Sequence, residues 1–199
     1  MKIWIIADTH FYHENIKKFQ GRPDDFNEQI IKNWNRLVQY NDLVIHLGDV
    51  IFGLNKEEQL PCLMATLPGK KILCRGNHDP KSATWYMERG FDFVCDYFIY
   101  QDIAFSHAPL TPLPPQSLVA DMRLVNWNIH GHFHSGQSKE PRETSKQRPY
   151  KDRYYNSEYY KTHKEKYILM HIDETLTPIA LDEKLKEVFY SKNDLPEKG

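Results

Sequence analysis

The chain has 199 residues, of which 40% are hydrophobic and 27% charged, and its formal net charge at pH 7 is −1. A chain of this length buries about 70% of its unfolded surface, so a single domain over 1–199 can form without disulfides or a structural metal. The near-zero charge gives no global field that would attract nucleic acid or a membrane. No apolar run approaches the roughly 20 residues of a membrane span, and no signal-peptide pattern is visible, which predicts a cytoplasmic protein.

The first half of the chain predicts strands that alternate with helices. Short apolar runs, rich in β-branched residues, predict buried strands over 2–7, 42–47 and 71–74, and helical spacing predicts helices over 25–40 and 56–67. This β-α-β-α-β order indicates a parallel sheet with crossover helices.

Individual residues suggest where these helices begin and end. Asp24 or Asp25 is the expected N-cap of the first helix. The Pro68-Gly69 pair ends the second helix. Pro80 favours the first turn of a further helix.

The second half of the chain has a different character. Runs at 91–94, 97–100 and 103–106 are separated by few residues and predict meandering strands, followed by a Pro-rich loop. The remaining expected elements are strands at 127–130, 167–172 and 178–181, a helix at 182–190 with Asp182 as its cap, and a frayed end at 192–199.

The cysteines, Cys62, Cys74 and Cys95, are scattered and form no Cys-x-x-Cys pair. Such spacing is typical of buried, reduced thiols rather than of a redox or zinc motif. This usage agrees with a cytoplasmic location.

Residues 135–166 form a polar insertion with nine Lys and Arg against five Asp and Glu. A loop of this length within a compact domain is functional or mobile. One hypothesis places it in the wall of a substrate site, with Arg142, Arg148 and Arg153 contacting phosphates. The alternative is a solvated surface insertion.

Five short polar motifs each follow a predicted strand. Every motif has a common structural explanation when taken alone, such as a turn, a capping residue or a hydrogen-bonded histidine. Together they place carboxylate and imidazole groups at strand ends, where sites of α/β proteins collect. The set therefore predicts two metal ions that share one carboxylate. The motifs are Asp8-Thr9-His10, Gly48-Asp49, Gly76-Asn77-His78-Asp79, Ser106-His107 and Gly131-His132-Phe133-His134.

Spacing supports the pairing of some ligands. Asp8 and His10 are two residues apart, as are His132 and His134, so on extended chain the members of each pair project to one side. Asp79 follows His78 directly and is expected to orient its imidazole.

These motifs resemble the calcineurin-like metallophosphoesterase superfamily, whose pattern is D-x-H, G-D, G-N-H-[DE], H and G-H-x-H, over residues 8–134. The resemblance implies an α/β fold: a β-sandwich of mixed sheets flanked by helices, in four α-β-β-α layers. It also implies His78 as the catalytic residue that faces the substrate, with Asp79 behind it. By the same resemblance Asp8, His10, Asp49 and His134 would bind the first metal, and Asp49, Asn77, His107 and His132 the second.

Departures from the pattern narrow the subfamily. The segment after Gly48-Asp49 lacks the Asp-Arg pair of protein Ser/Thr phosphatases and diadenosine tetraphosphatases, and the G-D-x-F-[DE] of lipid-precursor pyrophosphatases is also missing. The Asp-x-His-Phe-x-His start resembles small bacterial and phage phosphoesterases, often phosphodiesterases. That start places His13 near the substrate, whereas its other interpretation is an exposed residue at a helix start.

The expected activity is hydrolysis of a phosphate ester, preferably a diester, by in-line attack of a hydroxide that bridges two divalent ions. His78 would protonate the leaving oxygen or stabilise phosphate charge. Nitrogen and oxygen ligands without thiolate suit Mn²⁺ first, with Fe or Zn²⁺ as alternatives. The loops around Phe11 and Phe52 would help to shape the substrate pocket.

Two other functions compete with this expectation. A metal-dependent nuclease would need a basic groove with stacking aromatics, for which only 135–166 offers the residues. A non-catalytic metal-binding scaffold is disfavoured because every ligand position and His78 are retained. A small-molecule phosphate ester is therefore the expected partner, rather than nucleic acid or a membrane, and the oligomeric state is left open.

Overall fold

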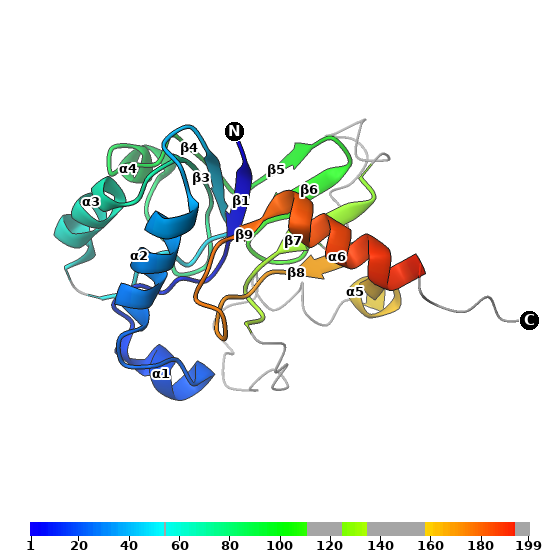
Figure 1. Ribbon diagram of the computed structural model, residues 1–199, viewed down its shortest axis with the longest axis horizontal. Coiled ribbons are helices and arrows are strands. Elements are labelled where there is room, and N and C mark those ends of the chain that lie inside the picture. The colour runs from blue at the N-terminus through cyan, green and yellow to red at the C-terminus, as the bar shows by residue number, and fades with distance from the viewer. Residues whose placement is uncertain (54, 111–124, 135–157, 194–199) are drawn as a thin grey trace, which may run out of the picture.

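The computed structural model of the chain describes residues 1–53, 55–110, 125–134 and 158–193 (Figure 1). Its first sheet has the strand order β4-β3-β2-β1-β9, in which β1, β2, β3 and β4 run parallel and β9 is antiparallel to β1. The predicted parallel sheet of the first half is therefore confirmed. Its strands are β1 (Ile3–Ile6), β2 (Leu43–His46), β3 (Lys70–Cys74), β4 (Phe93–Cys95) and β9 (Ile179–Ala180).

The second sheet has the order β5-β6-β7-β8. The pair β5–β6 is antiparallel, whereas β6–β7 and β7–β8 are parallel, so both sheets are mixed. This arrangement confirms the predicted sandwich of mixed sheets. Its strands are β5 (Tyr97–Tyr100), β6 (Ile103–Ser106), β7 (Trp127–His130) and β8 (Tyr167–Leu169).

The predicted meander over 91–106 is wrong in its first strand. β4 pairs in parallel with β3 of the first sheet, and the chain crosses to the second sheet after Cys95, so only β5 and β6 form a hairpin. Short spacing between apolar runs cannot distinguish a hairpin from a change of sheet, because both need only a few connecting residues.

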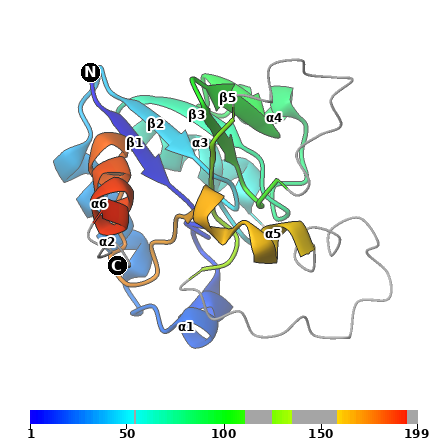
Figure 2. The ribbon, with the colours of Figure 1, turned by 90° about the vertical axis from the view of Figure 1, so that its right-hand side faces the viewer.

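Helices cover the sandwich on both sides. α2, α3 and α4 lie against the first sheet, and α5 and α6 lie on the side of the second sheet (Figures 1 and 2). α6 also contacts β1 and β9 at the sheet edge. The helices are α1 (Glu14–Gln20), α2 (Phe26–Leu37), α3 (Lys56–Thr66), α4 (Ala83–Met87), α5 (Glu158–Thr162), the 3₁₀ helix η2 (Lys164–Lys166) and α6 (Leu181–Asn193).

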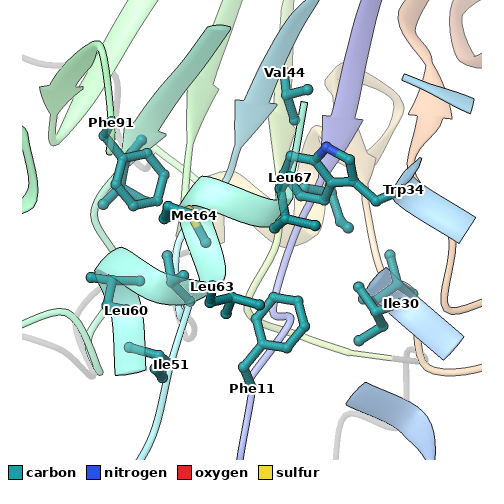
Figure 3. Packing of buried hydrophobic residues seen from close by; sticks show 14 of the residues in the cluster. Phe11, Ile30, Trp34, Val44, Ile51, Leu60, Leu63, Met64, Leu67 and Phe91 are labelled. Carbon is teal, nitrogen blue, oxygen red and sulfur yellow. The ribbon is translucent and has the colours of Figure 1, made fainter. Parts of the chain in front are cut away.

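Neighbouring residues of β1 supply two separate cores, because successive side chains of a strand point to opposite faces. Ile6 belongs to the cluster between the first sheet and its helices, where Trp34 of α2 and Leu63 of α3 also lie (Figure 3). Ile5 belongs to the cluster between the two sheets, with Phe105 of β6. Burial on both faces explains why these strands are continuous apolar runs.

Some local predictions need correction. α4 begins at Ala83 rather than near Pro80, because the Ser82 hydroxyl accepts the Trp85 N–H and so satisfies an otherwise unpaired donor of the first turn. α6 begins at Leu181, directly after β9, which places Asp182 inside the first turn rather than at the cap.

Further differences concern a cysteine, a helix start and two expected loops. Cys62 is exposed, so only part of the buried-thiol prediction holds. Asp25 occupies the N-cap position of α2, but its side chain makes no capping hydrogen bond. The helix α1 was not predicted, and α5 with η2 lies within the expected 135–166 insertion. Arg142, Arg148 and Arg153 lie outside the described residues.

Among the described residues, the helices are all too short or too polar to cross a membrane.

Candidate metal centre

The loops that carry the motifs are tied together just beyond the strand ends. The Asp8 N–H donates to the Gly48 carbonyl at 3.0 Å, which continues the β1–β2 pairing. The Gly131 N–H donates to the His107 carbonyl at 2.9 Å, which continues the β6–β7 pairing. The His132 main-chain N–H donates to Asp8 Oδ2 at 2.8 Å, so strand exits from both sheets converge at one end of the sandwich.

Most of the expected ligands have an unusual backbone. A positive φ is uncommon for residues other than glycine, and it costs energy unless surrounding contacts enforce it. The expected ligands with a positive φ are Asp8 (φ 52°), His10 (47°), Asp49 (55°), His132 (71°) and His134 (52°). The extended chain expected for the Asp8/His10 and His132/His134 pairs is therefore wrong, and His132 and His134 fall in different ligand groups.

Two glycines allow these loops to approach one another. A side chain at Gly76 would collide with the Asp49 carboxylate, and one at Gly131 would come within 2.5 Å of Asp8 Oδ2. The glycines of the Gly-Asn-His and Gly-His motifs are therefore required by close packing against the carboxylates.

The first ligand group consists of Asp8, His10 and His134, whose candidate ligand atoms all lie within 4.8 Å of one another. His10 Nε2 lies 4.0 Å from Asp8 Oδ1, and the rings of His10 and His134 stack at 5.2 Å. Asp8 Oδ1 and both ring nitrogens of His10 are buried without a hydrogen-bond partner among the described residues. Buried polar atoms without partners are costly, so they indicate a site for a missing cation.

The second group consists of Asp49, His107 and His132, again within 4.8 Å. His107 Nδ1 lies 2.7 Å from the Leu47 carbonyl, which can only accept, so Nδ1 carries the proton and Nε2 presents its lone pair. That lone pair faces His132 Nδ1 at 2.7 Å, Asn77 Oδ1 at 3.0 Å and Asp49 Oδ2 at 3.5 Å. With the His132 ring in the tautomer that leaves Nδ1 unprotonated, all of these atoms can bind one cation between them.

Asp49 stands between the two groups. Its Oδ2 lies 3.6 Å from His10 Nε2 and 3.5 Å from His107 Nε2. One carboxylate oxygen therefore faces both sets of ligand atoms, as sharing between two ions requires.

Burial sets the protonation of the ligands. It raises the pKa of the Asp8 carboxyl to about 6, although His107 and His134 act in the opposite direction. Burial also holds the pKa of His10 and His132 well below the usual imidazole value, with nearby histidines adding to the effect. These two imidazoles are therefore neutral at pH 7, the form that binds metal.

His78 and Asp79 lie beside this centre. The main-chain N–H of His78 donates to Asp49 Oδ1 at 2.8 Å. The His78 imidazole ring lies 5.5 Å from the ring of His10. The Asp79 carboxylate accepts main-chain N–H groups of Asp49 at 2.7 Å and Gly76 at 2.8 Å. Asp79 thus joins the Gly48-Asp49 loop to the Gly76-Asn77 loop through the main chain, rather than through the expected contact with the His78 imidazole.

The structure brings His13 next to the first group. Its ring lies 5.5 Å from that of His10 and stacks on Phe52 at 4.1 Å. His13 is also the N-cap residue of α1, so it stands at a helix start, as one interpretation of the sequence expected, and lies beside the site, as the other did.

Two residues of the centre were missed by sequence reasoning. Arg22 and Asp173 are buried, and the guanidinium donates to the carboxylate at 2.7 Å and 3.0 Å. Arg22 also donates at 2.7 Å to the carbonyls of both Asp8 and Thr9. Asp173 follows the predicted strand 167–172 directly, as Asp8 follows the strand 2–7, and this shared position was the available signal.

Asp173 also contacts the first ligand group. Both of its oxygens lie 3.2 Å from His134 Nδ1, so this nitrogen donates and Nε2 is directed to the metal position. Burial acts to lower the pKa of His134, but the Asp173 hydrogen bond and the charges of Asp8 and Asp173 outweigh it and raise the pKa.

The described donor set fits two divalent ions. It offers carboxylate and amide oxygens with imidazole nitrogens, and no thiolate, which suits Mn²⁺, Fe or Zn²⁺. Asp8, His10 and His134 would hold one ion, His107, His132 and Asn77 the other, with Asp49 shared.

Comparison with known proteins agrees with this geometry. The family model for calcineurin-like phosphoesterases matches residues 1–193. The uncharacterised protein MJ1445 of Methanocaldococcus jannaschii is 34% identical over 143 residues, which cover 70% of this chain and 73% of that protein. The crystal structure of AQ665, a protein of unknown function from Aquifex aeolicus, superposes with a TM-score of 0.64 at 26% identity, covering 94% of this chain and 98% of that one.

Proposed function

Because the chain belongs to the calcineurin-like phosphoesterase family, we propose that this metal-dependent phosphoester hydrolase is a phosphodiesterase acting on a small-molecule diester. The observation that carries the proposal is the position of Asp49 Oδ2, which lies 3.6 Å and 3.5 Å from nitrogen ligands of the two separate groups. A shared carboxylate between two ligand sets suits a two-ion site for phosphoryl chemistry.

When bound, the two ions would activate a water for attack on phosphorus and offset the charge of the phosphate oxygens. Asp49 would support both ions, and Asn77 would contribute a neutral oxygen to one of them. The imidazole N–H of His78 would donate a proton to the leaving oxygen or a hydrogen bond to the phosphate. Asp79 would fix the loop from which His78 projects, through its main-chain hydrogen bonds.

The charges around the centre favour a diester over a monoester. The positive charge of Arg22 acts to lower the pKa of both His10 and His134. Its guanidinium, however, is already bound to Asp173 and to main-chain carbonyls. A monoester dianion brings one more negative charge than a diester monoanion. Arg22 is therefore not available to add to the positive charge that the two ions would supply, which supports a singly charged diester as the substrate.

The test compares bis-p-nitrophenyl phosphate with p-nitrophenyl phosphate, using metal-stripped protein titrated with Mn²⁺, then with Fe²⁺ and Zn²⁺. We expect metal-dependent cleavage that favours the diester and saturates at two ions per chain. Asp182→Ala, an exposed change on α6, serves as a matched control for Asp49→Ala. Preference for the monoester would make the protein a phosphatase, and no turnover with two ions bound would support a scaffold.

A further inference from the structure

Phe52 is a large apolar residue that is exposed beside the metal centre. Its side chain is 39% exposed, whereas Ile51, the residue before it, is 1% exposed. Single exposed apolar residues are common on protein surfaces and need no special account. Phe52 differs because its ring contacts His13 and His78, which lie beside the metal centre.

The rings of Phe52 and three histidines are in contact, each with two of the others. His13 stacks on Phe52 at 4.1 Å with 27° between the planes, and Phe52 meets His78 edge-on at 5.5 Å. His10 lies 5.5 Å from His13 and 5.5 Å from His78. The aromatic surface therefore extends from a candidate metal ligand to an exposed phenyl ring without interruption.

The main chain holds this surface in place. The Phe52 N–H donates to the Phe11 carbonyl at 2.9 Å, and Phe11 forms a parallel bridge with Ile51. Phe11 and Ile51 are fully buried in the core against α3 (Figure 3). A ring fixed in this way loses little conformational freedom when it binds a flat partner, so stacking on it is favourable.

We propose that Phe52, supported by His13, is a stacking platform for a planar aromatic or heteroaromatic group carried by the substrate. The substrate class is then a phosphodiester in which one esterified alcohol bears a flat ring, either a nucleobase or an aryl group. This inference rests on the proposed phosphodiesterase function. Stacking of one base on an aromatic side chain strengthens binding about 5- to 150-fold.

The experiment uses three diesters with the same p-nitrophenyl leaving group, whose second alcohol is thymidine (through its 5′ oxygen), phenol or methanol. For each ester, kcat/KM is measured with the Mn²⁺-loaded wild type and with Mn²⁺-loaded Phe52→Ala. Dividing the wild-type value by the variant value for the same ester removes differences in intrinsic ester reactivity. We expect Phe52→Ala to reduce the advantage of the ring-bearing esters over the methyl ester about tenfold or more. Phe52→Tyr should retain that advantage.

Phe93→Ala is the matched control, since Phe93 is also exposed, at 51%, but lies on β4. This variant should change none of the three ratios. A larger effect with thymidine than with phenol assigns the platform to nucleobases, and equal effects assign it to any flat ring. No loss on any ester would overturn the platform. Because the shared p-nitrophenyl group is itself a flat ring, equal losses on all three esters support the platform only if the binding difference described below is present, and overturn it if that difference is missing.

A binding measurement separates this inference from the proposed function. Thymidine 5′-monophosphate and inorganic phosphate are titrated calorimetrically into Mn²⁺-loaded wild type and Phe52→Ala. We expect the nucleotide to bind about tenfold more tightly than phosphate in the wild type only. If no ester is cleaved but this difference persists, the phosphodiesterase proposal fails and the platform stands. If the esters are cleaved and the difference is missing, the platform fails alone.

Discussion

The two ligand groups of the centre are supported in different ways. In the first group, His134 is oriented by the buried Asp173, whose charge is balanced by Arg22. In the second group, His107 is oriented by the neutral carbonyl of Leu47. The first group thus depends on a buried ion pair, and loss of either partner leaves an uncompensated buried charge that strongly destabilises the fold. The second group depends on the strand backbone.

One dinuclear centre can therefore contain one ligand group whose geometry depends on charged side chains and another whose geometry depends on main-chain hydrogen bonding. The shared Asp49 joins the two groups, and its main-chain N–H is held by Asp79 at 2.7 Å. Changes at Asp49, at Asp173, at Asp8 and at the two close-packed glycines should therefore affect the two groups unequally.

The largest effect is expected at the shared carboxylate. Asp49→Ala should lower kcat by more than about 10³-fold, because it removes support from both ions and one lost electrostatic contact alone costs about 10²–10³. Metal content by mass spectrometry should fall for both ions. Retention of one full equivalent would show that Asp49 is not shared.

Breaking the ion pair should affect the first group selectively. Asp173→Asn leaves Arg22 buried without a counter-charge and should lower the free energy of unfolding by about 3–5 kcal/mol. It should also weaken binding of one metal about 10–100-fold through the altered His134 contact, as outer partners of metal ligands do. Calorimetric metal titration and chemical denaturation measure the two effects separately.

The double variant Arg22→Met with Asp173→Leu sharpens that result. It removes both charges, so stability should recover relative to Asp173→Asn while the weak metal affinity remains. Unchanged binding of both metals in either variant would mean that the buried pair has no part in holding His134.

Asp8 should make metal-free protein less stable as the pH rises. Its folded pKa of about 6 exceeds its ordinary value of 3.8, so between these pH values the folded state binds more protons than the unfolded state. Stability is therefore lost as pH rises through this window, by about 3 kcal/mol in total. Metal-free Asp8→Asn lacks this loss and should be the more stable protein at pH 7, with the difference vanishing near pH 4.

Urea denaturation of both proteins across pH 4–8, in the presence of a chelator, tests this expectation. A constant difference between wild type and Asp8→Asn across the range would contradict it. With Mn²⁺ added the order should reverse, because only the wild type has the first-group carboxylate.

The smallest changes are at the glycines. Gly76→Ala should displace Asp49, and Gly131→Ala should displace Asp8, each with about 1–3 kcal/mol of destabilisation from overpacking. Metal titration should show weaker binding of both ions in the former and of one ion in the latter. Gly21→Ala is the control for a glycine-to-alanine change away from the ligands: the added carbon meets no atom within 4 Å, although the φ of 69° strains any side chain there. It should lose some stability but bind both ions normally.

The sequence determined the strands and the order of the motifs. Short apolar runs end shortly before Asp8, Asp49 and His107, and the structure places each of these residues just beyond a strand of the core. Hydrophobic periodicity is a local property, so it is readable from neighbouring residues alone. The family resemblance then implied the metal groupings from these motifs.

Only the tertiary structure decided what supports those ligands. Arg22 and Asp173 are 151 residues apart in the chain, and no local pattern couples them. The crossing of β4 into the first sheet and the contact of Phe52 with His13 likewise depend on how distant segments pack. Burial and pairing of side chains arise when the sheets close around a common core, so the charges that tune the site are set by the fold rather than by neighbours in sequence.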